Sequence, residues 1–329
     1  MKIAINGFGR IGRALLRSIL AQEDCGLTVT AINDLADGLT LAHLLKYDSV
    51  HGRLSQDVKY VDGMLVIGGH EIRLTNHREI GDLDWTDIDY VCECTGVLGD
   101  RQLLMQHLQQ GAKRVLVSAP VGENADIMVV YGVNHQAISP QHRIISNASC
   151  TTNCLAPVAK VLNDAFGLID GSMVTVHAYT ADQRLVDAVH SDLRRSRAAA
   201  LSMIPTKTGA AKAIGMVIPE LAGKLDGYAL RVPTANVSLV DLTCRFEQST
   251  DVEQIKEALK LAASGEMQGV MAYSDEPLVS CDYNHQPASA TIDSLEIRRV
   301  GDLYKILAWY DNEWGFVNRM IDVMSYAKV

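Results

Sequence analysis

The sequence predicts an α/β domain with a doubly wound parallel sheet, followed by an α+β domain with a mostly antiparallel sheet. Through the first 148 residues, short apolar strands alternate with helix-length segments, which is the pattern of βαβ units. Beyond residue 149 the strands become longer and alternate apolar with polar side chains, as in a sheet with one covered face. We therefore expect two domains that meet near residue 149.

The first half contains strands and helices of ordinary length. In chain order we expect strand 3–6, helix 12–22, strand 27–33, helix 36–46, strand 90–94, helix 100–109, strand 114–118 and strand 143–146. Strands joined through helices in this way form right-handed crossovers on a parallel sheet. The carboxyl ends of these strands are then the expected ligand-binding edge.

The second half opens with a predicted helix over residues 150–166. Leu155, Val158 and Leu162 share one face of it, and Pro157 should kink it or open it locally. The remaining expected elements are strands 173–177, 236–245 and 303–310, a helix over 252–263 capped by Asp251, and a terminal helix over 314–326.

Composition and charge exclude several classes of protein. The 329 residues are 48% hydrophobic and 21% charged, which is typical of a folded globular chain. A net charge of −9 argues against nucleic acid as the primary partner, and no apolar run approaches the length of a membrane span. Seven scattered cysteines without an export signal indicate reduced thiols, and no metal site is expected. We expect a cytoplasmic protein.

A GxGxxG motif follows the first strand directly and opens the first helix. Its members are Gly7, Gly9 and Gly12, and in this context they predict a turn that binds a pyrophosphate. Asp34 ends the second strand, where a carboxylate accepts a hydrogen bond from a ribose 2′-hydroxyl and disfavours a 2′-phosphate. The sequence thus predicts a Rossmann domain that prefers NAD to NADP. The alternative is a tight turn in a flavodoxin-like domain, with Asp34 as a helix cap.

Cys150 begins the helix of the second half, where the helix dipole favours a thiolate. It is the leading candidate nucleophile, although a cysteine beside an apolar helix is often a small core residue. Cys154 lies one turn further along the helix and fits the core better. Cys92 and Cys94 have no partner pair elsewhere that would complete a zinc site, and we interpret both as core residues.

A thiol nucleophile needs a base, and His177 is the best candidate among ten histidines. It ends a predicted strand and precedes a loop. Position alone is equally compatible with a packed or surface histidine. The alternative candidates for the base lie in predicted loops or at helix ends: His43, His51, His135 and His190.

Basic residues gather in the second half: Arg184, Arg194, Arg195, Arg197, Lys207, Lys212 and Arg231. Together with the hydroxyl-rich turn 206–211 before a helix, they indicate a phosphorylated small substrate. The segment 192–197 is equally compatible with a solvated or subunit-facing arginine cluster.

Several longer motifs resemble one family along the whole chain. Segments 6–13, 45–49, 146–154, 208–213, 231–234 and 309–315 are similar to those of phosphorylating glyceraldehyde-3-phosphate dehydrogenases. The resemblance implies oxidation of glyceraldehyde 3-phosphate to 1,3-bisphosphoglycerate with NAD and inorganic phosphate, a reaction of glycolysis and gluconeogenesis. It also implies a homotetramer with residues 180–203 at a subunit interface. Residues 314–329 would then join the 1–149 domain, leaving 150–313 as the catalytic domain.

The resemblance also implies a role for individual residues. Cys150 would attack the aldehyde and His177 would activate the thiol. Thr180 and Arg231 would bind the substrate phosphate, and the inorganic phosphate site would contain Ser149, Thr151, Thr208 and Gly209. Beside the glycines of the turn, the dinucleotide would contact Arg10, Ile11, Asp34, Arg78 and Ser118, with Asn312 on the nicotinamide amide.

Two departures from the family pattern leave alternatives open. Ala188-Val189 stands where the NAD-specific pattern often has Leu-Pro, which leaves NADP use open. Segments 129–134 and 282–285 are similar to those of erythrose-4-phosphate dehydrogenases, but Thr180 and Thr208-Gly209 favour the triose phosphate. A non-catalytic protein that senses NAD or acts as a scaffold is a further alternative, because a fold does not fix a function.

Overall fold

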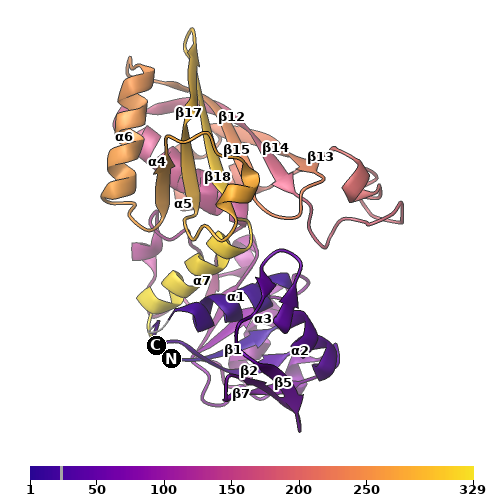
Figure 1. Cartoon of the computed structure of the whole chain (residues 1–329). Coiled ribbons are helices and arrows are strands. Elements are labelled where there is room, and N and C mark those ends of the chain that lie inside the picture. Colours follow the sequence, from indigo (N-terminus) through magenta and orange to yellow (C-terminus); the bar gives the residue numbers. More distant parts are fainter. Residues whose placement is uncertain (23–24) are drawn as a thin grey trace. The chain divides into compact units, whose positions relative to one another are not determined.

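The computed structural model describes residues 1–22 and 25–329 and forms two compact units. The first unit comprises residues 1–129, 135–148 and 317–329, and the second comprises residues 130–134 and 149–316. Figure 1 shows the chain coloured along its sequence and labels many of the elements of each unit. Each unit has one large sheet, so each is described on its own.

The first unit is built on a sheet with the strand order β10-β11-β9-β8-β1-β2-β7-β6-β5. The strands are β1 (Lys2–Asn6), β2 (Thr28–Asn33), β5 (Val58–Val61), β6 (Met64–Ile67), β7 (His70–Thr75), β8 (Tyr90–Glu93), β9 (Arg114–Val117), β10 (Ile127–Met128) and β11 (Ile144–Ser146). From β10 to β7 every pair is parallel, which confirms the predicted parallel sheet. Strands β5, β6, β7 and β10 were not predicted, and β5 and β6 extend the sheet with antiparallel pairing.

Helices connect the parallel strands of the first unit. They are α1 (Arg10–Ala21), α2 (Gly38–Lys46) and α3 (Arg101–Gln109), and a short ribbon of β3 (Tyr47–Asp48) and β4 (Gly52–Arg53) follows α2. Asp37 and Asp100 cap α2 and α3 through their side chains. Helix α1 begins two residues earlier than predicted, with Gly9 as its N-cap, so the glycine motif itself forms the first turn.

The end of the chain completes the first unit. Helix α7 (Trp314–Tyr326) enters it at Val317, and Val317, Met320 and Met324 are fully buried. Tyr90 Oη on β8 donates a hydrogen bond of 2.6 Å to the carbonyl oxygen of Ala327. The last residues of the chain are therefore part of the core that supports the parallel sheet.

The second unit is built on a sheet with the strand order β13-β14-β12-β15-β18-β17-β16. The strands are β12 (Leu168–Ala178), β13 (Ile204–Lys207), β14 (Leu225–Val232), β15 (Ser238–Phe246), β16 (Met271–Ser274), β17 (Ala290–Val300) and β18 (Leu303–Tyr310). Pairing is antiparallel except between β12 and β14 and between β16 and β17, which confirms the mostly antiparallel sheet. Strands β13, β14, β16 and β17 were not predicted.

Helix α4 (Cys150–Phe166) has the predicted bounds and packs against β12, β15, β17 and β18. The helix continues through Pro157 without interruption, so the expected local opening does not occur. A proline removes one backbone donor, and the buried apolar face of α4 outweighs that loss. Helices α5 (Ala210–Val217) and α6 (Val252–Ser264) pack beside α4, and α6 begins at the predicted cap, Asp251.

No helix within residues 1–22 and 25–329 combines the length and apolar character needed to cross a membrane.

Candidate active site

Cys150 is the first residue of helix α4. The Ser149 side chain caps the helix by accepting a hydrogen bond of 3.1 Å from the Thr152 amide. The first helical N–H groups, at Cys150 and Thr151, lie at the positive end of the helix dipole. The thiol is thus placed where backbone donors can stabilise negative charge on sulfur or on an adjacent oxygen.

His177 faces this thiol from the end of strand β12. Its Nε2 lies 3.5 Å from Cys150 Sγ, and its Nδ1 lies 2.6 Å from the carbonyl oxygen of Ala178. A proton on Nδ1 donated to that carbonyl leaves the Nε2 lone pair directed at the thiol. This tautomer gives the pair the geometry of a nucleophile and its general base.

Arg231 completes the cluster from strand β14. The parallel register of β12 and β14 pairs His177 with Arg231. Arg231 Nη1 donates to the Ala178 carbonyl at 2.9 Å and lies 2.6 Å from His177 Nδ1. With the proton on Nδ1 both nitrogens are donors, so the Ala178 carbonyl that they share, and not a hydrogen bond between them, holds the two side chains together. The Arg231 Nε is buried without a partner, so the guanidinium retains an unused donor.

Burial and the Arg231 cation set the protonation of the pair. Burial raises the pKa of Cys150, and the Arg231 cation opposes that increase. Burial and the same cation lower the pKa of His177 to about 3. The imidazole is therefore neutral near pH 7 and able to accept a proton, which is the form that a general base requires.

Tyr310 supports the cluster from strand β18 and was not found by sequence reasoning. Its hydroxyl lies 2.9 Å from Thr151 Oγ1 and 2.8 Å from Thr175 Oγ1, and all three side chains are buried. The Tyr310 ring also contacts the His177 ring edge-on, with centroids 5.9 Å apart. This network connects the first turn of α4 to β12, the strand that carries the base.

The predicted phosphate residues lie on two further segments of the second unit. Thr180 is exposed just beyond β12, and Thr208 and Gly209 immediately precede α5. Thr208 Oγ1 accepts a hydrogen bond of 3.2 Å from the Ala210 amide. Within the described residues, no hydrogen bond connects Thr180 or Thr208 to the cluster around Cys150.

Arg195 fixes the segment that precedes β13. Its Nε donates to Thr206 Oγ1 at 2.9 Å, and its guanidinium forms an ion pair with Asp182. The Arg195 cation also contributes to the lowered pKa of His177. From the sequence, Arg195 is only one member of a basic cluster, because the two partners that place it, Thr206 and Asp182, are more than ten residues away.

The other cysteines and histidines do not share this geometry. Cys92, Cys94 and Cys154 are buried, which confirms their interpretation as core residues, and burial raises the pKa of Cys94 to about 12. Among the histidines of the described chain, only His177 has a ring nitrogen in contact with Cys150.

In the first unit, the glycine motif forms a backbone cradle. Gly7 has φ +91°, and a β-carbon there would lie 2.5 Å from the Thr95 amide nitrogen. A β-carbon on Gly12 would lie 2.3 Å from the Gly7 carbonyl oxygen, whereas one on Gly9 would meet no atom within 4 Å. Two glycines are thus required by packing, and the third leaves open space above the helix N-terminus, as a bound pyrophosphate requires.

The other predicted cofactor residues of this unit include three that follow parallel strands. Asp34, Arg78 and Ser118 come after β2, β7 and β9, at the carboxyl edge of the sheet. The Asp34 carboxylate accepts hydrogen bonds from the Phe8 amide at 2.7 Å and the Ala36 amide at 2.9 Å. Asp34 therefore also holds the glycine turn.

Arg10 and Ile11 form the first turn of α1. The Arg10 guanidinium pairs with Asp48. Burial would raise the pKa of Asp48, but the His51 amide and Arg10 lower it to about 2. Asp48 therefore carries its charge at neutral pH and orients Arg10 beside the cradle.

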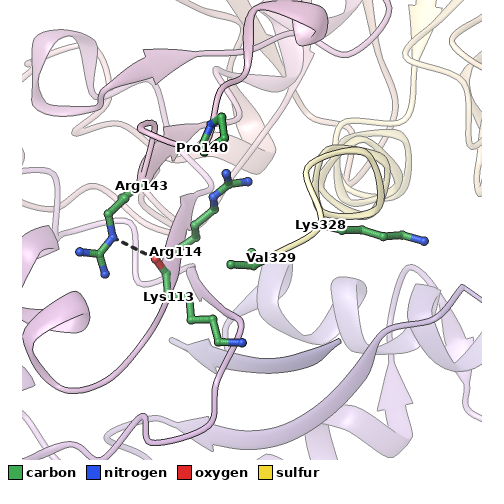
Figure 2. A pocket seen from close by; sticks show the side chains of 6 residues that line it. All are labelled: Lys113, Arg114, Pro140, Arg143, Lys328 and Val329. Atoms are coloured by element: carbon green, nitrogen blue, oxygen red, sulfur yellow. Dashed lines mark hydrogen bonds between the residues drawn. The ribbon is translucent and has the colours of Figure 1, made fainter.

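A separate pocket of about 390 Å³ in the first unit contains none of the predicted site residues. Figure 2 shows its lining, which is Lys113, Arg114, Pro140, Arg143, Lys328 and Val329. Arg114 donates to the Ala327 carbonyl at 2.8 Å, and Arg143 donates to the Lys113 carbonyl at 3.2 Å. These arginines donate to backbone carbonyls, and no cysteine, serine, threonine or histidine lines the pocket. No group of metal-binding side chains was found in the described part of the chain.

Comparisons with known proteins agree with these two units. Residues 1–101 match the family model of the glyceraldehyde 3-phosphate dehydrogenase NAD binding domain, and residues 149–312 match that of the C-terminal domain. The chain is 53% identical to glyceraldehyde-3-phosphate dehydrogenase of Geobacillus stearothermophilus, with 99% of this chain and 98% of the relative covered. It is 52% identical to the protein of that name from Xanthobacter flavus, with 98% and 97% covered.

Proposed function

Because this chain belongs to the glyceraldehyde 3-phosphate dehydrogenase family, we propose that it oxidises D-glyceraldehyde 3-phosphate to 1,3-bisphosphoglycerate with inorganic phosphate. NAD is its cofactor. The observation that carries the proposal is the Cys150–His177 pair, with Sγ 3.5 Å from Nε2 at the N-terminus of a 17-residue helix.

The first step is attack of Cys150 on the aldehyde. His177 Nε2 takes the thiol proton, a bond forms between sulfur and the carbonyl carbon, and the carbonyl electron pair moves to oxygen. The N–H groups of the first turn of α4 are positioned to stabilise that oxyanion. The imidazolium of His177 returns the proton to this oxygen, so the step ends with a thiohemiacetal on Cys150 and a neutral His177.

The second step converts the thiohemiacetal to a thioester. When bound, the nicotinamide of NAD supplies the acceptor for the hydride that leaves the former aldehyde carbon. The neutral His177 takes the hydroxyl proton, so a carbonyl forms as the C–H bond breaks. Inorganic phosphate then attacks the thioester carbon and releases the acyl phosphate, and sulfur departs as the thiolate.

Two anion sites serve this chemistry. We assign the substrate phosphate to Thr180 and Arg231, and the unused Nε donor of Arg231 supports that assignment. We assign inorganic phosphate to Ser149, Thr151, Thr208 and Gly209. Because the Thr151 hydroxyl already contacts Tyr310, we expect Thr151 to contribute mainly its backbone N–H.

We assign the dinucleotide to the cradle of Gly7, Gly9 and Gly12, with Arg10, Ile11, Asp34, Arg78 and Ser118 around it. The open space at Gly9 and the carboxylate of Asp34 at the strand edge support this assignment. Asn312 would donate to the nicotinamide amide.

The decisive experiment measures NADH formation by the purified protein with glyceraldehyde 3-phosphate and with erythrose 4-phosphate. Each substrate is tested with and without inorganic phosphate. Phosphate-dependent oxidation of the triose is the expected result. Preferred, phosphate-independent oxidation of the tetrose would instead assign the chain to the erythrose-4-phosphate activity, and inactivity with both would favour a sensing or scaffold role.

We also propose a homotetramer. Large apolar side chains are exposed in the segment expected at a subunit interface, residues 180–203: Leu185, Val186, Val189, Leu193, Leu201 and Met203. Each is at least 68% exposed, and such a concentration is typical of a surface that a partner covers. Analytical ultracentrifugation should give about four times the 35.9 kDa chain mass, and a monomer would refute the assignment.

A further inference from the structure

Ser238, at the start of strand β15, connects the loop of the general base to Asn312. The residue is 1% exposed. The Ala178 amide donates to Ser238 Oγ at 3.0 Å, and Ser238 Oγ donates to Asn312 Oδ1 at 3.1 Å. Ala178 is also the residue whose carbonyl contacts His177 Nδ1.

The hydrogen-bond inventory of Ser238 fixes the orientation of Asn312. A backbone N–H can only donate, so the Ser238 hydroxyl accepts from Ala178 and has its own proton left to donate. That proton requires an acceptor, which is Asn312 Oδ1. The Nδ2 group of Asn312 is consequently directed away from Ser238. It makes no hydrogen bond within the described residues, and it is not among the enclosed polar atoms without a partner.

The residue before Ser238 is strained. Val237 has φ +67°, a conformation that a β-branched residue rarely adopts. Its other neighbour, Asn236, donates to Asp311 Oδ2 at 2.9 Å. The residues on both sides of Val237 therefore hold two consecutive residues, Asp311 and Asn312. If Val237 relaxed to a negative φ, either Asn236 or Ser238 would turn away from its partner. The hydrogen bonds of these two residues to Asp311 and Asn312 therefore maintain the strain.

We propose that Ser238 is a positioning residue for the cofactor, which orients Asn312 so that its Nδ2 donates to the nicotinamide amide. This inference rests on the proposed function, which assigns Asn312 to that amide. Without the Ser238 hydroxyl, the Asn312 side chain loses the bond that distinguishes its oxygen from its nitrogen. Binding of NAD should then weaken, while binding of the aldehyde should not.

The test compares Ser238→Ala with Ser289→Ala. Ser289 is a matched control, because its hydroxyl is buried in the same unit but has no hydrogen-bond partner. Ser238→Ala should raise KM for NAD by about tenfold, which is the effect expected from the loss of one hydrogen bond. It should change KM for the aldehyde by less than about twofold. Ser289→Ala should change neither constant, and Ser238→Thr, which keeps the hydroxyl, should restore KM for NAD. If Ser238→Ala does not fold, Ser238→Cys, whose thiol is a weak donor, should show the same direction of change.

A double-mutant cycle with Asn312→Ala tests the route of the effect. If Ser238 acts through Asn312, Ser238→Ala should add less than about twofold to KM for NAD in the Asn312→Ala background. A full effect in that background, or an unchanged KM in Ser238→Ala, would overturn the proposal.

NAD titration by fluorescence separates this inference from the proposed function. Failure of the wild type to oxidise the triose would refute the proposed reaction, yet NAD affinities of the four proteins of the cycle would still be measured. Unchanged affinity in Asn312→Ala would refute both the assignment of Asn312 and the role of Ser238. Lower affinity in Asn312→Ala but not in Ser238→Ala would refute the role of Ser238 alone.

Discussion

The glycine cradle of the first unit and the cysteine cluster of the second are built by opposite means. The cradle uses backbone from one short segment, residues 7–12, and excludes side chains from it. The cluster uses side chains from α4, β12, β14 and β18 and depends on strand register to bring them together. Substitutions that add atoms should therefore impair the function of the cradle, and substitutions that remove side-chain atoms should impair the function of the cluster.

Removal of one sulfur should give the largest effect. Cys150→Ser replaces a thiol by a hydroxyl of much higher pKa, and turnover should fall by at least about a thousandfold. NAD binding should change by less than about twofold, because the cradle belongs to the other unit. Initial rates and NAD titration measure the two effects. Cys281→Ser, at an exposed cysteine, is the control, and near-normal turnover in Cys150→Ser would refute the proposed nucleophile.

Substitution of a glycine of the cradle by alanine should have different effects at Gly12 and at Gly9. Gly12→Ala forces a β-carbon to within 2.3 Å of the Gly7 carbonyl, so it should lower the unfolding temperature and abolish NAD binding. Gly9→Ala has open space and a φ of −72°, so it should leave the unfolding temperature nearly unchanged. It should still weaken NAD binding by about tenfold or more, because the methyl group enters the space assigned to the pyrophosphate. Wild-type NAD affinity in Gly9→Ala would contradict the assignment.

Asp34 contributes a side chain to the cradle, because its carboxylate accepts a hydrogen bond from the Phe8 amide. We also propose that this carboxylate binds the ribose. Asp34→Asn removes the negative charge that disfavours a 2′-phosphate. The ratio of NAD to NADP affinity should fall by about tenfold, roughly 1.4 kcal/mol. Titration of both dinucleotides measures the ratio, with Asp37→Asn, at an exposed helix cap, as a control that keeps its value. An unchanged ratio would show that other groups select the cofactor.

The smallest effect concerns the pH dependence of the cluster. The Arg231 cation lowers the pKa of Cys150, so its removal should raise that pKa further. In Arg231→Leu the midpoint of Cys150 alkylation by iodoacetamide should move to higher pH by about one unit. The exposed Arg245→Leu should keep the wild-type midpoint. A shift of the midpoint to lower pH would contradict this prediction. It would mean that loss of the Arg231 side chain lowers the pKa of Cys150 by reducing its burial, and that this outweighs the loss of the cation.

The elements that could be predicted are those determined by neighbouring residues. The glycine turn is read from one strand and one helix, and α4 has its predicted bounds because Ser149 caps it and its apolar residues repeat at helical spacing. Strand β14 was missed because Gly227 interrupts its pattern, although β14 carries Arg231. Gly227 lies there because a β-carbon would meet the Met173 carbonyl at 2.0 Å.

The supporting residues of the site could not be predicted for a related reason. Thr175, Ser238 and Tyr310 come from three strands that are adjacent only in the folded sheet. Each would be read locally as an ordinary strand residue. Their roles depend on the register that pairs Ser238 with Tyr310 and Val174 with Asp241, which no local pattern encodes.

The position of the last helix has a consequence for synthesis of the protein. Residues 317–329 belong to the first unit, and the Ala327 carbonyl is held by both Tyr90 and Arg114. On the ribosome, the first unit therefore lacks part of its core until the whole second unit has been synthesised. The N-terminal domain of a protein usually folds first during synthesis, but the first unit of this chain cannot complete its fold in that order. A nascent chain stalled near residue 300 should leave both units incomplete, because β18, which connects β17 and β16 to the rest of the second sheet, and the final helix of the first unit have not yet been made.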